Sequence, residues 1–350
     1  MSLDERKKQV LHAIVDDYVS TNEPVGSNAL IERHNFRVSS ATLRNDMAEL
    51  ERLGLIEKPH TSAGRIPSDR GYREYVNSLM TVDQLTEEEQ SEIKSRIDSS
   101  IDEVTNLLKN ATQTLSEATG FVSLAMSPRL RKSFLTQLKI LMIEPGKALV
   151  VMALSAGVVK DKVVRIPNFI TDDQIYKISS AIEKHLTGKP LDEITLITVE
   201  TAIADTEIPN PLLKQVLYEA YTAIKQADEL NIYLEGEHRM LNLPDFSTMG
   251  RARELLGTLS DPSMVAGYVN EMNGSEESGS KDSYMVRIGQ EITLDGLDDC
   301  SFITATYNLS DSVSGNIGVI GPKRMEYSKV ISQIDFVKKT LNENIRKITE

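Results

Sequence analysis

A short polar run near residue 40 carries side chains suited to reading the edges of nucleic-acid bases. Arg44 has the paired donors that recognise guanine, and the amide of Asn45 can both donate to adenine and accept from it. Ala41 is small enough to let a backbone approach the bases closely. Ser39 and Ser40 can cap a helix, and the free N–H groups of a helix start also suit a phosphate. These residue types predict contact with DNA, provided that one helix displays them together.

The spacing of apolar residues predicts such a helix. Leu43, Met47 and Leu50 recur at i, i+4 and i+7 and would face a core, and Gly54 is the kind of residue that ends a helix. At 100° per residue, a second set lies on the opposite face. It consists of Ala41, Asn45, Ala48 and Arg52. An ordinary amphipathic surface helix would have the same pattern, so this helix alone does not establish DNA binding.

The segment after the helix predicts a hairpin with a basic tip. Residues 55–58 and 65–67 have the composition of two strands, and the small polar stretch 59–64 lies between them. Lys58 and Arg65 flank this tip, which could contact phosphates or place an arginine in a narrow minor groove. Two helices before the helix at residues 43–50, the second of them short, and a basic helix after the hairpin complete the order of a winged helix-turn-helix.

The charge balance favours the same interpretation. Residues 33–73 hold eight basic and five acidic side chains, a net charge of +3, whereas the whole chain has a net charge of −13. A basic unit on an acidic body limits non-specific binding of polyanions. The candidate DNA-contacting residues are Ser39, Ser40, Ala41, Thr42, Arg44, Asn45, Arg52, Lys58, His60, Thr61, Ser62, Gly64, Arg65, Arg70 and Tyr72.

This segment resembles the N-terminal domain of the HrcA family, the heat-inducible transcription repressors of bacteria. The run KPHTSAGRIP at 58–67 is the most specific part, because generic winged helices lack it. The other stretches that carry the resemblance are 40–45, 53–55 and 71–73, with weaker similarity at 121–123, 242–246 and 315–322.

The body of the chain predicts helices and two groups of strands. Apolar residues at spacings of three and four from Ile93 to Ala118 indicate one long helix. It could form a coiled coil between subunits or pack across a sheet of its own chain. Strand patterns at 135–166 and 284–320 flank a mostly helical stretch, and we expect both groups to share one sheet of an α+β domain.

The expected fold class is therefore α+β, and the resemblance implies a GAF-like fold for the sheet domain and a dimerisation role for the inserted stretch. That stretch could otherwise be a second subdomain without a partner. The expected division is a winged helix at 1–80, a connecting long helix at 81–120, a GAF-like α+β domain at 121–167 and 231–350, and a mostly helical inserted dimerisation domain at 168–230.

Composition argues against several other classes. The single cysteine, Cys300, cannot form an internal disulfide, which fits a reducing cytoplasm, and we interpret it as a packing residue. No signal peptide and no apolar run of about 20 residues is recognisable, so we expect no membrane association. The five histidines lack metal-ligand spacing, and the glycines at 315–321 lack a phosphate-binding lysine. We expect no catalytic residues, metal or cofactor, and hence no enzyme.

The expected function is a homodimeric repressor that binds an inverted repeat of double-stranded DNA, because two-fold symmetry of protein and operator match. The resemblance implies operators upstream of chaperone operons, and a GroEL-type chaperonin that keeps the repressor active until heat stress. It would be cytoplasmic, and associated with the nucleoid when bound to its operator. One alternative is a metabolite-gated winged-helix regulator. Another is an acidic protein-interaction module for which DNA binding is secondary.

Overall fold

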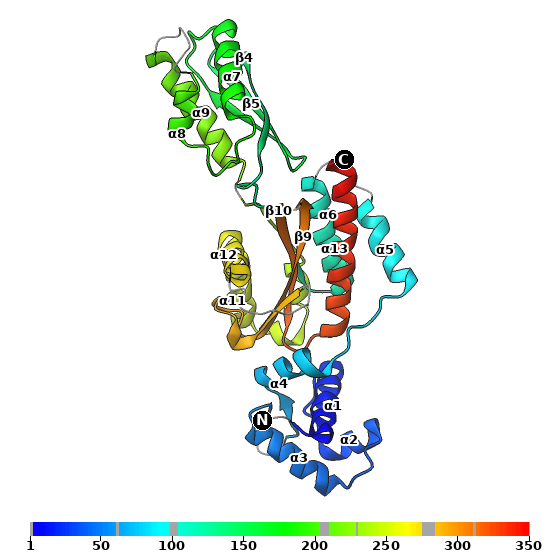
Figure 1. The fold of residues 1–350 in the computed structure, drawn as a ribbon. Coiled ribbons are helices and arrows are strands. Elements are labelled where there is room, and N and C mark those ends of the chain that lie inside the picture. Colours follow the sequence, from blue (N-terminus) through cyan, green and yellow to red (C-terminus); the bar gives the residue numbers. More distant parts are fainter. Residues whose placement is uncertain are drawn as a thin grey trace.

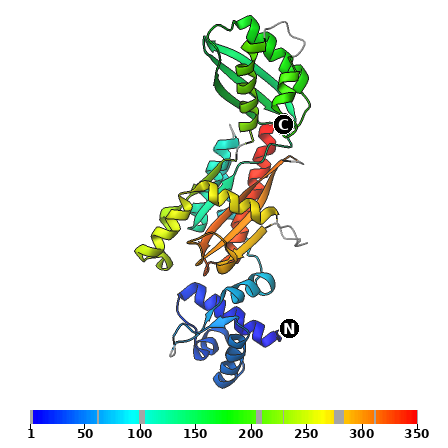
Figure 2. The same cartoon turned by 90° about the vertical axis from the view of Figure 1, so that its left-hand side faces the viewer.

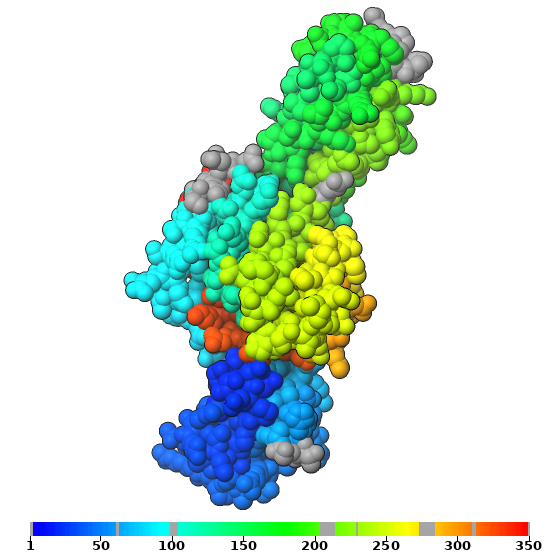
Figure 3. Space-filling view, turned by 180° about the vertical axis from the view of Figure 1, so that it is seen from behind, coloured from blue at the N-terminus to red at the C-terminus, as the bar shows by residue number. Residues whose placement is uncertain are grey.

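The computed structural model describes residues 3–60, 63–98, 104–203, 210–228, 230–274, 284–310 and 313–349. They form three parts that follow one another along an elongated molecule (Figures 1 and 2). The N-terminal unit (residues 3–79) lies at one end and the inserted unit (residues 135–226) at the other (Figure 3). The central unit comprises the remaining described residues, and the fold as a whole is α+β, as expected.

The N-terminal unit begins with three helices and continues into a hairpin and a further helical segment. Its elements in order are α1 (Glu5–Thr21), α2 (Ser27–His34), α3 (Ser40–Arg52), β1 (Ile56–Glu57), β2 (Ile66–Pro67), α4 (Asp69–Glu74) and the π-helix η1 (Tyr75–Leu79). The side chains of Asp4, Ser39 and Ser68 each accept a backbone N–H in the first turn of α1, α3 and α4. These polar caps determine where the helices start.

The core of the N-terminal unit lies between α1, α2 and α3. Leu11 of α1, Leu30 of α2 and Leu43 of α3 are completely buried. Arg6 adds a bidentate ion pair with Asp46, with Nε to Oδ2 at 2.8 Å, which joins the start of α1 to α3. The predicted apolar face of α3 is therefore confirmed, and the opposite face is left for solvent.

The central unit is built on a five-stranded antiparallel sheet in the order β7-β3-β10-β9-β8. Its strands are β3 (Val122–Met126), β7 (Ile232–Glu235), β8 (Tyr284–Ile288), β9 (Cys300–Ser310) and β10 (Val313–Pro322). The strands expected between 284 and 320 are thus confirmed, whereas β3 was not anticipated. Its helices are α5 (Glu87–Asp98), α6 (Val104–Thr119), α10 (Glu237–Met240), η2 (Pro244–Phe246), α11 (Met249–Leu259), α12 (Pro262–Gly274), η3 (Gly289–Glu291) and α13 (Tyr327–Thr349).

Helices cover both faces of this sheet (Figure 1). On one face Ile303 and Ile317 join the core that α6 and α13 complete. On the other face Leu124 and Phe302 pack in a second core with residues of α11 and α12. Alternate residues of each strand therefore enter different cores, as the two-residue period of a strand requires.

The single long helix expected within 81–120 is corrected to two helices, α5 and α6. Arg96 of α5 forms an ion pair with Glu117 of α6, and the two helices pack side by side. In one straight helix these residues would lie about 31 Å apart, at 1.5 Å per residue. The apolar seam serves packing within the chain, because Leu108 and Leu115 are buried in the core shared with α13 and the sheet.

The inserted unit has a sheet of its own, which corrects the expected domain boundaries. Its elements are β4 (Leu135–Glu144), β5 (Lys147–Leu154), β6 (Val159–Arg165), α7 (Asp172–Leu186), α8 (Leu196–Thr201) and α9 (Asn210–Gln226). The three strands pair only with one another in the described structure, so the insertion starts before β4 and is α+β rather than mostly helical. The reason is that the inward residues of β4 and β5, such as Ile140 and Val150, are buried beneath α7 and α9.

Candidate nucleic-acid interface

The outer face of α3 collects the residues expected to read bases. Arg44, Asn45 and Arg52 are exposed, and Ala41 and Ala48 are exposed between them. This helix lies at the end of the molecule farthest from the inserted unit (Figure 1). The N-terminal unit therefore presents a ridge that combines hydrogen-bonding side chains with two alanines over which a duplex could approach closely.

A polar cluster at the start of α3 restrains two of these side chains. Ser40 Oγ donates to Asn28 Oδ1 at 2.7 Å and lies 2.9 Å from Ser27 Oγ. Arg44 Nε donates to the same Ser27 hydroxyl at 3.3 Å, so the guanidinium is oriented without use of its terminal nitrogens. The N-cap Ser39 also lies 2.9 Å from the hydroxyl of Thr42. These hydrogen bonds already restrict the rotamers of Arg44 and Ser40, so the two side chains would lose less conformational entropy if they bound a ligand.

Sequence reasoning missed Ser27 and Asn28, because they belong to α2 and no spacing links them to α3. The signal available was the order of the elements: two short helices joined by a tight turn pack against each other at a steep angle, and here the start of α2 lies against the start of α3. The left-handed residue Asn35, with φ of 51°, makes this turn. Polar residues at the start of the second helix were therefore reasonable candidates to support the third.

The hairpin lies against Val25 in the segment that precedes α2, and Gly64 makes this contact possible. Val25 and Arg65 exchange two backbone hydrogen bonds of 2.8 Å. A Cβ on Gly64 would lie 2.5 Å from the Val25 carbonyl, so no side chain fits there. Lys58 and His60 are exposed at the tip. Thr61 and Ser62, also expected at the DNA surface, lie outside the described residues.

Arg65 has a different environment from the free side chain that the sequence suggested. Its guanidinium pairs with Glu51 of α3, with Nη2 and Nε at 2.8 and 3.0 Å from Oε2. The side chain is only 19% exposed. A phosphate could therefore gain Arg65 only in exchange for the Glu51 carboxylate.

The two candidates on α4 lie in different surroundings. Arg70 is exposed, with Nη1 3.3 Å from the position of a Cβ on Gly54, so it lies over the end of α3. Tyr72 is 2% exposed and its ring centroid lies 5.9 Å from that of Tyr327 in the central unit. Burial also raises the pKa of the Tyr72 phenol well above its ordinary value. The expected DNA contact by Tyr72 is therefore corrected, because its side chain belongs to the interior.

A charged hollow lies in the central unit, away from this interface. This hollow of about 240 Å³ between α5, α6 and α13 is lined by charges that pair with one another, among them Lys329 with Glu89 at 3.4 Å and Arg96 with Glu92 at 2.7 Å. No cluster of three or more possible metal ligands occurs among the residues described. Likewise, within the described ranges no helix is long and apolar enough to cross a membrane.

The chain is similar to known proteins over its whole length. The family model described as HrcA protein C terminal domain matches residues 105–331. The heat-inducible transcription repressor HrcA of Ruminiclostridium cellulolyticum is 39% identical, with coverage of 100% of this chain and 99% of that protein. The protein of the same name from Acetivibrio thermocellus is 38% identical, with coverage of 99% and 98%. A crystal structure of a hypothetical protein shares the fold, with a TM-score of 0.64, 22% identity and coverage of 99% of this chain and 100% of that one.

Proposed function

Since this chain belongs to the HrcA family, we propose that it represses transcription of heat-shock chaperone operons by binding an inverted-repeat operator as a homodimer. Two curated relatives that span its whole length are named heat-inducible transcription repressors. The observation that carries the DNA-binding part is the exposed face of α3, where Arg44 and Asn45 lie beside two alanines. In this proposal the N-terminal unit is a winged helix-turn-helix, with α3 as its recognition helix and the β1–β2 hairpin as its wing.

Each candidate residue has a proposed role that follows from its surroundings. Arg44, Asn45 and Arg52 would meet base edges in the major groove, where bidentate side chains distinguish the base pairs. The start of α3 would hold a phosphate, because its hydroxyls and free N–H groups gather there. The small residues Ala41 and Gly64 would permit close approach of the duplex. The candidates for contact with backbone phosphates are Ser39, Ser40, Thr42, Lys58, His60, Arg65 and Arg70. Thr61 and Ser62 stay in the proposed wing tip, and Tyr72 is left out.

The open face of the inserted sheet supports the proposed homodimer. Leu141, Leu149 and Val163 lie directly opposite one another across β4, β5 and β6. Leu141 is 52% and Val163 56% exposed, because α7 and α9 cover only the other face. An apolar row of this kind is typical of a surface that a partner covers. We propose that a second copy of the chain does so, and that the inserted unit is the dimerisation domain.

We further propose that the central unit is GAF-like and that a GroEL-type chaperonin maintains the active repressor. The antiparallel sheet with α6 and α13 on one face supports the first part. The exposed apolar row of the inserted unit supports the second, since apolar surface exposed before assembly makes a chain prone to aggregate. Heat would then occupy the chaperonin with other unfolded clients and relieve repression in the cytoplasm.

An electrophoretic shift tests this function directly. Purified protein is mixed with a labelled inverted-repeat duplex from a chaperonin promoter, with a scrambled duplex as competitor, with and without chaperonin. We expect specific binding that chaperonin strengthens after mild heating. Specific binding that heat and chaperonin leave unchanged would contradict the regulatory part. Failure to prefer the operator over the scrambled duplex in both conditions would contradict the operator assignment.

A further inference from the structure

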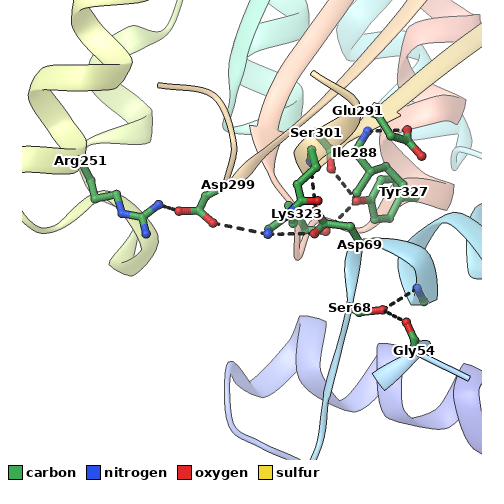
Figure 4. A network of polar contacts seen from close by, with 12 residues as sticks. Gly54, Ser68, Asp69, Arg251, Ile288, Glu291, Asp299, Ser301, Lys323 and Tyr327 are labelled. Atoms are coloured by element: carbon green, nitrogen blue, oxygen red, sulfur yellow. Dashed lines mark hydrogen bonds and ion pairs between the residues drawn. The ribbon is translucent and has the colours of Figure 1, made fainter. Parts of the chain in front are cut away.

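Helix α4 is held by the central unit through two charged side chains, Asp69 and Arg73. Figure 4 shows Asp69 beside Lys323. Asp69 stands at its first turn and Arg73 one turn later, so both lie on the same side of the helix as Tyr72. All three contact residues near η3 or the start of α13. The basic helix that follows the hairpin therefore faces the body of its own chain with this side.

Arg73 is bound at two points of the central unit. Its Nε donates to Glu291 Oε1 at 2.9 Å, its Nη2 pairs with the second carboxylate oxygen, and the same Nη2 donates to the Val286 carbonyl at 2.8 Å. Glu291 is itself fixed, because its Oε2 accepts the Ile288 N–H at 3.0 Å. A bidentate pair with a fixed carboxylate specifies direction as well as distance.

The Asp69 carboxylate packs directly against the backbone of η3, where Gly289 leaves no room for a side chain of its own. Its carboxylate accepts the Gln290 N–H at 3.0 Å and lies 2.9 Å from Lys323 Nζ. Gly289 has a φ of +54°, and a Cβ there would overlap the Asp69 carboxylate. Lys323 Nζ also forms an ion pair with Asp299, with Oδ1 at 3.4 Å. The receiving site is therefore built by the backbone of η3 and a chain of charges, and not by one mobile surface side chain.

The chain that leaves the N-terminal unit is also attached to the central unit. The Asp83 N–H donates to Ser328 Oγ at 2.7 Å, and this hydroxyl donates to the Thr81 carbonyl at 2.7 Å. Ser328 stands in the first turn of α13, close to Tyr327, whose hydroxyl lies 2.7 Å from Ser301 Oγ. The two attachment points, α4 and the connecting segment, thus fix the unit against the same part of α13.

We propose that Asp69 and Arg73 are positioning residues that dock the N-terminal unit in one orientation and so set the half-site spacing that the dimer accepts. The inference rests on the proposed function, because spacing has meaning only for a dimer on an inverted repeat. Each base pair inserted between half-sites rotates one of them by about 34° about the duplex axis. A unit held in one orientation cannot follow that rotation, whereas a loosely attached unit can.

The structure offers a matched pair of arginines on α4. Arg70 is exposed and pairs with no carboxylate in the described structure, whereas Arg73 is bound to Glu291. Removal of a phosphate-binding cation at Arg70 weakens binding to every duplex alike. Removal of the positioning ion pair at Arg73 instead changes which duplexes are accepted. Arg70→Glu therefore serves as the control with the same charge change on the same helix.

The first arm of the experiment measures orientation without DNA. Cysteines introduced at the exposed positions Glu32→Cys and Lys339→Cys carry spin labels, while the buried Cys300 stays unlabelled in the folded protein. Dilution with unlabelled protein suppresses distances between protomers. We expect one narrow distance distribution for the parent and for Arg70→Glu, and a broad or shifted one for Arg73→Glu. If the distance distribution of Arg73→Glu has the same width and the same mean as that of the parent, the proposal is overturned.

A charge swap distinguishes docking from damage to the fold. Arg73→Glu combined with Glu291→Arg restores an ion pair at the same place, so we expect the distribution to narrow again towards that of the parent. If Arg73→Glu unfolds the unit, the circular dichroism signal falls as well. In that case Arg73→Gln, which keeps a donor and removes the charge, is measured in its place and decides by the same criterion.

The second arm measures operator spacing. Affinities are compared for inverted repeats whose half-site separation differs by one to three base pairs. We expect the affinity of the parent to fall at least about tenfold per misplaced half-site, as it does when one bidentate base contact is removed, and that of Arg73→Gln to fall much less. The same spacing preference in both proteins would overturn the inference while leaving the proposed function intact. If the parent binds no operator, the proposed function fails, and the distances alone decide the docking.

Discussion

At the residue scale, Arg44 shows which features of the candidate site can be predicted from the sequence and which cannot. A count of 100° per residue places Asn45 away from the leucine face with Arg44 at its flank, and the structure shows that both are exposed. The same count says nothing of Ser27, which comes from another helix and restrains Arg44 at 3.3 Å. Tyr72 could not be assigned correctly, because its burial depends on Tyr327, a residue far away in the chain.

Replacement of Arg44 tests the proposed base contact. Arg44→Ala should reduce operator affinity by about 1–3 kcal/mol and relax the preference at one base position, because alanine cannot make the bidentate hydrogen bonds. Fluorescence anisotropy with operator and random duplexes measures both effects. The control is Lys58→Ala at the hairpin, which should weaken binding to the two duplexes alike. An equal loss on operator and random DNA for Arg44→Ala would show that it touches phosphate instead.

Replacement of Glu51 tests whether DNA competes for Arg65. Glu51→Gln removes the carboxylate that lies 2.8 Å from Arg65 Nη2 and leaves a neutral side chain of the same shape. Binding should become tighter on all duplexes, and the slope of log affinity against log salt should steepen by about one, because one more cation reaches phosphate. Arg65→Ala should show the opposite change. Unchanged affinity and slope in Glu51→Gln would mean that Arg65 keeps a structural role in the complex.

At the element scale, periodicity predicts most helices and strands but not their partners. The strands β4, β5 and β6 lie within the strand pattern expected at 135–166, yet their sheet was assigned wrongly. An apolar alternation shows that one face is buried and does not say whether a helix or another sheet covers it. The helix break between α5 and α6 was missed for the same reason, since two antiparallel helices keep the spacing that one helix would have.

An ion pair within α1 predicts a pH dependence of stability. His12 Nδ1 lies 2.8 Å from Asp16 Oδ2, and this hydrogen bond raises the pKa of His12 above its ordinary value, partly opposed by burial. The stabilisation is complete below the pKa of the unfolded chain, near 6.5, and is lost as pH rises through the higher folded value. Urea unfolding from pH 5.5 to 8.5 should therefore show falling stability above neutrality. The slope should flatten in His12→Gln and Asp16→Asn; an unchanged slope in both would refute the assignment.

At the scale of the whole molecule, the two ends differ in the charge and the polarity of their exposed surfaces. The basic segment and the exposed face of α3 lie at one end, and the apolar sheet face lies at the other (Figure 1). Composition predicted an acidic body with a basic unit, because net charge is a sum over residues and needs no fold. The docking of α4 on the central unit could not be predicted, since it depends on Asp69 meeting Gly289 and Lys323 from a distant part of the chain.

A charge on the open sheet face tests the proposed dimer. Val163→Glu places a carboxylate at the β6 end of the apolar row, and burial of an unpaired charge should raise the dimer dissociation constant at least about a hundredfold. Sedimentation velocity over a range of concentrations measures this change. The control Tyr176→Ser alters an exposed aromatic residue on α7, away from the face, and should leave the dimer intact. A Val163→Glu protein that remains as dimeric as the parent would place the interface elsewhere.

The central claim is that the exposed face of α3 reads bases in the major groove of an inverted repeat. Methylation interference on the chaperonin-promoter operator tests it most directly, because modification of guanine N7 blocks major-groove contacts. We expect interfering guanines in two tracts related by the two-fold axis of the repeat, and loss of interference at one guanine per half-site in Arg44→Ala. Interference absent from both half-sites, or identical in the parent and in both Arg44→Ala and Asn45→Ala, would contradict the account.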